Sequence, residues 1–213
     1  MAFIGNDIVD LTDPGNIGKS GDNRFLQRVF TIPERERIAA AGDPDAMMWM
    51  LWSVKETAYK VVRKIDPLAA STPRLYPVLL SPGDHGPIRS GMVHTPKGPV
   101  VIRVSVAGEY LHCIGAAPLP DILDHVLWSV DRLTPAGGGG DHSPSTAVRR
   151  HARLRLAALL HASAADIAIR RCQDIHGWGP PQPYLNEKPA PFDLSFSHDG
   201  AFVAYAMIPT GAG

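Results

Sequence analysis

The chain has 213 residues, which is enough for one large domain or two small ones. Hydrophobic residues make up 45% and charged residues 20%, close to the average of globular proteins, so the composition excludes a largely disordered chain. Lys plus Arg and Asp plus Glu both number 21, so the formal net charge is zero. This balance excludes non-specific nucleic-acid binding as the main activity, because such binding needs an excess of cations. An anionic ligand must instead be held by a local cluster of basic side chains.

Cysteine content and the absence of a long apolar stretch indicate the compartment. Cys113 and Cys172 are too few for a disulfide framework or a four-thiolate zinc site, and we expect two buried, reduced thiols, with a single bridge as the alternative. No stretch reaches the roughly 20 apolar residues that a membrane span needs, and the sequence begins without a basic leader. We therefore expect a cytoplasmic protein with no membrane partner.

The first part of the chain predicts one strand and two helices. Residues 2–11 are a short apolar strand that contains Asp7 and Asp10. Thr31 followed by Glu34 three residues later is a capping box, and it predicts a helix that continues to Ala41. A second helix over 44–64 follows, because its apolar residues recur every three or four positions and form one buried stripe. These residues are Met47, Met48, Leu51, Val54, Ala58, Val61 and Val62.

The rest of the chain predicts two hairpins and one helix. Alternating apolar residues over 100–106 and 110–114 flank a glycine-containing turn and indicate a hairpin, and residues 192–208 indicate another. A helix is expected over about 144–162. Residues 135–146 include four consecutive glycines, which are typical of a flexible tether. We therefore expect an N-terminal half over 1–134, a linker over 135–146 and a C-terminal half over 147–213.

The two predicted hairpins resemble each other. Residues 102–116 align with residues 194–208 at a constant offset of 92, which places Gly108 over Gly200 and Tyr110 over Phe202. The alignment predicts an α+β fold with two similar halves related by a pseudo-two-fold axis, although chance similarity between hairpins is the alternative. Val106 aligns with His198, so the two halves are expected to differ in chemistry.

Two acids are candidates for a metal site. Glu56 and Lys60 are four residues apart and share a face of the 44–64 helix, where they are either an ordinary surface ion pair or part of a buried polar site. Asp7 lies near the end of the first strand. Hard cations such as Mg²⁺ are bound by one or two carboxylates together with phosphate oxygens and water, so Asp7 and Glu56 suit Mg²⁺ if the strand meets the helix. The alternative is that both acids face solvent.

Basic residues in the second half are candidates for anion binding. His198 follows Ser197 at the turn of the last hairpin and could donate to a phosphate. A second cluster lies on the 144–162 helix, with a solvated helix face as the alternative. Its members are Arg149, Arg150, Arg153 and Arg155.

Four separated motifs resemble the signature of the 4′-phosphopantetheinyl transferases. They are Gly5-x-Asp7-Ile8-Val9-Asp10-Leu11, the segment from Arg24-Phe25 and Arg28-Val29-Phe30-Thr31 to Glu34, Trp52-Ser53-x-Lys55-Glu56-x-x-x-Lys60, and Ser195-Phe196-Ser197-His198. The resemblance covers residues 3–64 and, more loosely, 147–208. In the larger transferases, of the surfactin-synthetase-activating type, the half with the Ser-His motif comes first, so here the halves are in permuted order.

The resemblance implies an enzyme that moves the phosphopantetheine arm of coenzyme A onto a serine of an acyl or peptidyl carrier protein. Asp7 and Glu56 would then bind Mg²⁺. Glu56 and Lys60 would be catalytic, with Glu56 helping to remove the serine proton and Lys60 stabilising the charge on the phosphates. The alternatives are a non-catalytic module that binds coenzyme A or a protein, and a Mg²⁺-dependent phosphohydrolase.

The resemblance also implies the residues that hold coenzyme A. They are Lys55 and Lys60 near the nucleotide and phosphates, Ser197 and His198 at the phosphoadenosine end, Arg153 or Arg150 beside them, and Arg28 as a support. Two departures from the family pattern stand out. Val9 replaces an acid that the larger transferases often have, and Gln182 replaces a lysine, with Lys188 nearby as a substitute.

The carrier and the oligomeric state follow from the same resemblance. Family carriers present an acidic helix, and the region of Arg24 and Arg28 is the candidate docking patch. Two similar halves in one chain reduce the need for a partner subunit, so a monomer is expected.

Overall fold

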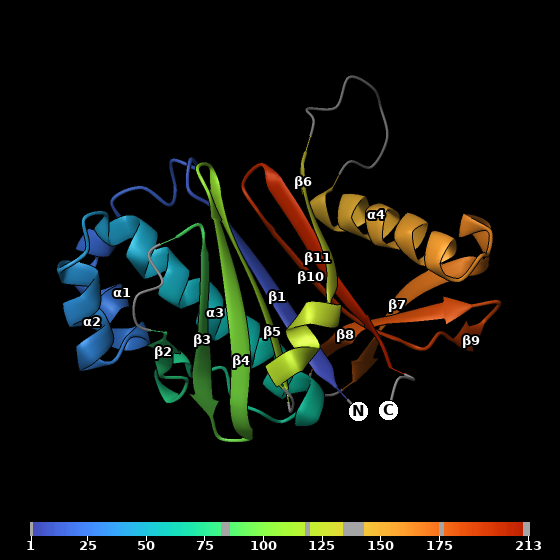
Figure 1. The fold of residues 1–213 in the computed structure, drawn as a ribbon, viewed down its shortest axis with the longest axis horizontal. Helices are drawn as coiled ribbons and strands as arrows, with labels where there is room; N and C mark the ends of the chain where they lie inside the picture. The colour runs from blue at the N-terminus through green and yellow to red at the C-terminus, as the bar shows by residue number, and fades with distance from the viewer. Residues whose placement is uncertain (1, 82–85, 118–119, 134–142, 175–176, 211–213) are drawn as a thin grey trace.

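The computed structural model describes residues 2–81, 86–117, 120–133, 143–174 and 177–210 (Figure 1). Most of the predicted linker, residues 135–142, lies outside the described residues. Among the described helices, none is long and apolar enough to cross a membrane. Cys113 is buried and Cys172 is exposed, and both are free thiols, so the expectation of two buried thiols is wrong for Cys172.

The first half is a five-stranded antiparallel sheet with a long helix across one face (Figure 1). The strand order is β1 (Phe3–Asp10), β5 (Tyr110–Ala117), β4 (Gly98–Ala107), β3 (Ile88–Thr95) and β2 (Val78–Leu80). Helix α3 (Pro44–Ile65) covers the sheet, and α1 (Asn23–Val29) and α2 (Ile32–Ala39) pack at its side. Short 3-10 turns lie at Lys19–Gly21, Pro73–Leu75 and Pro120–His125.

The second half has two small sheets and one helix. Strands β10 (Phe192–Asp199), β11 (Phe202–Pro209) and β6 (Leu127–Arg132) form one sheet, with α4 (Pro144–Leu159) packed against it. Strands β7 (Ile167–Asp174), β8 (Gly177–Leu185) and β9 (Lys188–Pro189) form the other, and a 3-10 turn at Ala164–Asp166 precedes β7. The structure is therefore a mixed α+β fold, as predicted.

Helices α2, α3 and α4 begin where the sequence predicts, whereas α1 was not among the predicted elements. Glu34 closes the capping box of α2, and its carboxylate accepts a hydrogen bond from the backbone N–H of Thr31 at 2.7 Å. Asp43 accepts from the N–H of Ala46 and caps α3, whose apolar stripe is buried against the sheet. Gly5 allows this close packing, because a Cβ at that position would lie 2.3 Å from the carbonyl oxygen of Thr57.

The two central hairpins share one register. Ala107 pairs with Tyr110 in the first and Asp199 with Phe202 in the second, so the offset of 92 aligns the two turns. A further contact also repeats: the N–H of Leu11 donates to the carbonyl of Glu109 at 2.8 Å, and the N–H of Leu133 donates to that of Ala201 at 2.7 Å. These repeats are consistent with a pseudo-two-fold relation in which β1 corresponds to β6.

This correspondence corrects the predicted domain boundary. Strand β6, residues 127–132, pairs with β11 in the second sheet, so the first half ends before residue 127 rather than at 134. The prediction was wrong because the glycine run draws attention to the site of a tether, whereas strand pairing decides to which half a segment belongs.

Strand β10 runs beside the outer edge of β1 (Figure 1), and its side chains join the two halves there. The backbone N–H groups of Ile4, Asn6 and Asp10 donate to Asp193, Ser195 and Asp199 at 2.7, 2.9 and 2.8 Å, respectively. The partners alternate on both strands because neighbouring strand residues point to opposite sides.

A buried lysine closes this junction. Lys64 on α3 is 5% exposed, and its ammonium donates to both carboxylate oxygens of Asp193 at 2.8 Å. It also donates to the carbonyls of Ile4 and Leu194 at 2.7 and 2.6 Å. One cation thus contacts both halves.

We predict that Lys64→Met lowers the free energy of unfolding by about 3–5 kcal/mol, because it leaves Asp193 buried without its counter-ion. Urea denaturation measures this loss. The matched control is Lys97→Met, since Lys97 pairs with Asp66 at the surface, and we expect a loss of about 0–1 kcal/mol there. Equal effects of the two substitutions would contradict the role given to Lys64.

Candidate functional site

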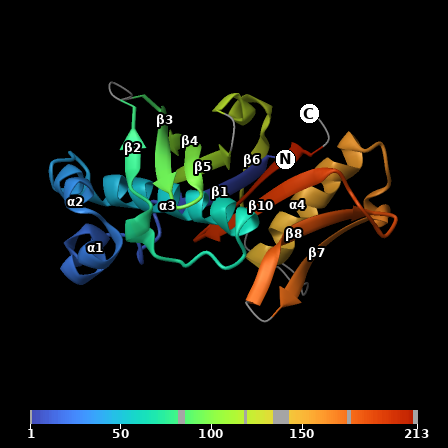
Figure 2. The same ribbon diagram turned by 90° about the horizontal axis from the view of Figure 1, so that it is seen from below.

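A cleft of about 390 Å³ lies where the two halves meet. Helix α3 contributes Tyr59, Lys60, Arg63 and Lys64, and the second half contributes residues of α4, β7, β8 and β10. Figure 2 shows the C-terminal end of α3 next to β8 and β10. The site therefore depends on both halves of the chain.

Asp7, Glu56 and Lys60 are brought together at the junction of β1 and α3. The Lys60 ammonium lies 2.7 Å from Asp7 Oδ1 and 2.8 Å from the carbonyl oxygen of Asn6. Burial raises the pKa of the Asp7 carboxyl, and Lys60 opposes this effect. Burial also raises the pKa of Glu56, and the negative charge of Asp7 raises it further. Additional positive charge beside Asp7 and Glu56 would therefore stabilise both carboxylates in their ionised forms.

Ser197 and His198 fall on different sides of β10. His198 lines the cleft, and it is near enough to Asp7 to make a small contribution that lowers the pKa of that carboxyl. Ser197 is buried at the junction of the halves, where its Oγ accepts from Asn6 Nδ2 at 3.0 Å. The predicted contact of Ser197 with coenzyme A is therefore not supported, because adjacent strand residues face opposite ways.

Lys55 is also misplaced by the prediction. It is 1% exposed, and its ammonium bonds Glu34 Oε1 at 2.8 Å and the carbonyls of Tyr76 and Pro73 at 2.8 and 3.1 Å. An ammonium has three N–H donors, and all three are used. Lys55 therefore stabilises the packing of α2, α3 and residues 73–76, and it has no donor left for a ligand.

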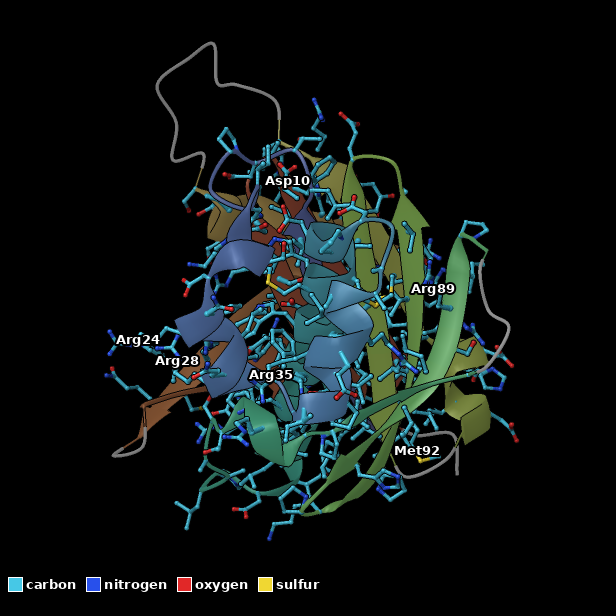
Figure 3. All side chains as sticks on the ribbon, turned by 90° about the vertical axis from the view of Figure 1, so that its left-hand side faces the viewer. Asp10, Arg24, Arg28, Arg35, Arg89 and Met92 are labelled. Carbon is cyan, nitrogen blue, oxygen red and sulfur yellow. The ribbon has the colours of Figure 1, made fainter. Side chains whose placement is uncertain are left out.

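Two predicted arginines lie away from the cleft. Arg28 is exposed on α1, and its Cζ atom lies 5.9 Å from the centre of the Phe25 ring. Figure 3 shows Arg28 beside Arg24, pointing away from the molecule. Arg153 lines a separate groove between α4 and β7. Of the arginines on α4, Arg149 lines the cleft, and it also lines the groove that contains Arg153.

Arg171 is a cleft residue that the sequence did not identify. Its guanidinium donates to the carbonyls of Gly179 and Trp178 at 2.7 and 3.3 Å. Partial burial and the charge of Arg149 lower its pKa, so the two guanidinium groups lie near each other. Two like charges held together in a cleft form a binding place for an anion.

The position of Gln182 explains why this cation was missed. Gln182 pairs with Arg170 and accepts from the Tyr184 hydroxyl at 3.2 Å, and it does not line the cleft. Arg171 pairs with Pro181 on the neighbouring strand. Strand pairing thus supplies from β7 a cation that the sequence lacks on β8, whereas Lys188 lies exposed on β9.

The carboxylates of Asp7 and Glu56 fit a hard cation whose remaining ligands are phosphate oxygens and water. Within the described residues no group of three His, Cys, Asp or Glu side chains could hold a metal. Mg²⁺ is commonly bound by only one or two carboxylates, together with phosphate oxygens and water. Two partly buried carboxylates with raised pKa values match that pattern.

Residues 3–74 match the family model of the 4′-phosphopantetheinyl transferase superfamily, which confirms the resemblance over this segment. The segment runs from β1 to the turn after α3 and contains Asp7, Glu56 and Lys60. No curated protein matches the chain.

We predict that Glu56→Gln raises the melting temperature at pH 8 without divalent cations and leaves it unchanged at pH 4. The folded state raises the pKa of Glu56 above its value in the unfolded chain. The protonated Glu56 side chain therefore contributes to stability at low pH, and this contribution is lost as the pH rises through the pKa of the folded state. Thermal denaturation at both pH values measures the difference. Glu36→Gln, at an exposed position, is the control. A variant less stable than the parent at pH 8 would contradict the prediction.

Proposed function

Because residues 3–74 match the 4′-phosphopantetheinyl transferase superfamily, we propose that the chain transfers 4′-phosphopantetheine from coenzyme A to a serine of a carrier protein, with Mg²⁺. The observation that carries this proposal is the cleft between the halves. Lys60 of the matched segment lines the cleft and bonds Asp7 at 2.7 Å, and Arg149, Arg171 and His198 of the second half line it as well.

Coenzyme A suits the two ends of the cleft. Its pyrophosphate belongs beside Asp7, Glu56 and Lys60, where a cation can bridge carboxylates and phosphate oxygens. The 3′-phosphate belongs near Arg149 and Arg171, since guanidinium groups bind phosphate with paired hydrogen bonds. The cleft volume of about 390 Å³ lies within the range of small-molecule sites.

The chemistry is a displacement at phosphorus. The carrier serine oxygen forms a bond to the β-phosphorus of coenzyme A, and the bond from that phosphorus to the bridging oxygen breaks, releasing adenosine 3′,5′-bisphosphate. Glu56 accepts the serine proton, and its raised pKa suits it to this task. Lys60 stabilises the charge that develops on the leaving phosphate. Mg²⁺, held by Asp7 and Glu56, would supply further positive charge at the pyrophosphate.

The carrier surface is proposed on α1. Arg24 and Arg28 are exposed there and point away from the molecule (Figure 3), which suits an acidic partner helix. Both halves of one chain build the cleft, so a monomer in the cytoplasm can act without a second subunit.

We predict that an apo acyl carrier protein gains the mass of one phosphopantetheinyl group when it is incubated with the protein, coenzyme A and Mg²⁺. Intact-mass spectrometry measures the gain. Glu56→Gln abolishes it, whereas Glu36→Gln leaves it unchanged. No gain on several carriers, combined with coenzyme A binding by calorimetry, would favour a non-catalytic coenzyme A module. No gain and no binding would favour a protein-binding module.

We predict that Arg171→Gln weakens coenzyme A binding about tenfold, the loss expected when a charged hydrogen bond to phosphate is removed. Calorimetry with 3′-dephospho-coenzyme A is the key comparison, because the parent and the variant should bind it equally. Arg170→Gln is the matched control, since Arg170 pairs with Glu187 on the exposed surface. A loss of the same size with both ligands would indicate that Arg171 acts through the fold.

A further inference from the structure

The outer edge of β1 is built from its even-numbered residues. Strand β1 pairs with β5 in one continuous register from Phe3 to Asp10. The N–H groups of Ile4, Asn6 and Asp10 donate to side chains of β10 instead of β5. Because an antiparallel strand directs the backbone groups of alternate residues to one side, the carbonyl of Ile8 faces the same edge.

Two lysines of α3 bond the carbonyls of this edge in order. Lys64 donates to the carbonyl of Ile4 at 2.7 Å, and Lys60 donates to that of Asn6 at 2.8 Å. Each step moves four residues along α3 and two along β1. Four helical residues advance about 6 Å and two strand residues about 6.8 Å, so the steps nearly match. Helix and strand therefore form a ladder of cations on carbonyls.

The next step of the ladder replaces the cation by an acid. Four residues before Lys60 is Glu56, and two residues after Asn6 is Ile8. The same step sizes lead from the Lys60–Asn6 contact to Glu56 and the carbonyl of Ile8. Two oxygen acceptors cannot bond each other without a proton or a cation between them. Lys60 also bonds Asp7, so Asp7 lies between the second and third steps.

We infer that the main-chain carbonyl of Ile8 is the third protein ligand of the divalent cation that Asp7 and Glu56 bind, an inference that rests on the proposed function. Backbone carbonyl oxygens are among the oxygen ligands of hard cations, and a cation at the third step would satisfy the carbonyl as the ammonium groups do at the first two. It also accounts for Val9, which is 3% exposed and apolar, at the position where the resemblance leads one to expect an acid. A backbone ligand makes a third acidic side chain unnecessary.

The test is electron–nuclear double resonance with Mn²⁺ in place of Mg²⁺, on the full chain with coenzyme A. The protein is produced with isoleucine that carries ¹³C at its carbonyl carbon. We expect a ¹³C coupling to the bound Mn²⁺. The coupling should vanish in Ile8→Val, which keeps the carbonyl but removes the label, and should persist in Ile4→Val.

Each result decides the inference. Bound Mn²⁺ without ¹³C coupling would overturn the Ile8 ligand while leaving the proposed function intact. A coupling that survives Ile8→Val would also overturn it, because the label then lies elsewhere. Failure of Mn²⁺ to bind at all would overturn the metal site of the proposed function and this inference together.

Discussion

The structure depends on the outer edge of β1, whose backbone groups must find partners because they are buried between the halves. A paired strand would satisfy them directly, but it would lie about 4.8 Å away and merge the two sheets. Side chains do so instead: Asp193, Ser195 and Asp199 from β10, and Lys60 and Lys64 from α3. The side chains keep the halves apart while holding them in register. The cleft is next to this edge because the connection is made by side chains and not by a shared strand.

The two halves are similar in topology and complementary in chemistry. Asp7 pairs with Cys113, and the corresponding pair in the second sheet is Ser129 with Tyr205, so the counterpart of Asp7 is a serine. The counterpart of His198 is Val106. Asp7 and His198 therefore have no chemical equivalent at the corresponding positions of the other half. The cleft between the halves is lined by basic groups of both, Lys60 from the first half and Arg149 and Arg171 from the second.

Much of this arrangement follows from local patterns. The capping box, the apolar stripe of α3 and the offset between the hairpins all describe short-range geometry, which the chain retains when it folds. Glu56 and Lys60 share a helix face for the same reason. Neighbours in sequence are harder to assign. Lys55 is adjacent to Glu56 on α3, yet Glu34 and the carbonyls of Tyr76 and Pro73 together use its three N–H donors. Ser197 and His198 likewise differ in position, because neighbouring side chains of a strand point to opposite faces of the sheet.

The sequence by itself determined helices α2, α3 and α4, the two similar hairpins and the group of Asp7, Glu56 and Lys60, because these depend on spacing within one element or on one recognisable motif. Only the tertiary structure decided that β6 pairs within the second sheet, that Lys55 and Ser197 are buried in hydrogen bonds to other parts of the chain, and that Arg171 lines the cleft whereas Gln182 does not. Those outcomes depend on which strand pairs with which and on which helix covers which face. Strand pairing and helix packing join residues that are far apart in the sequence. Burial and charge pairing determine these contacts only when the two halves pack together.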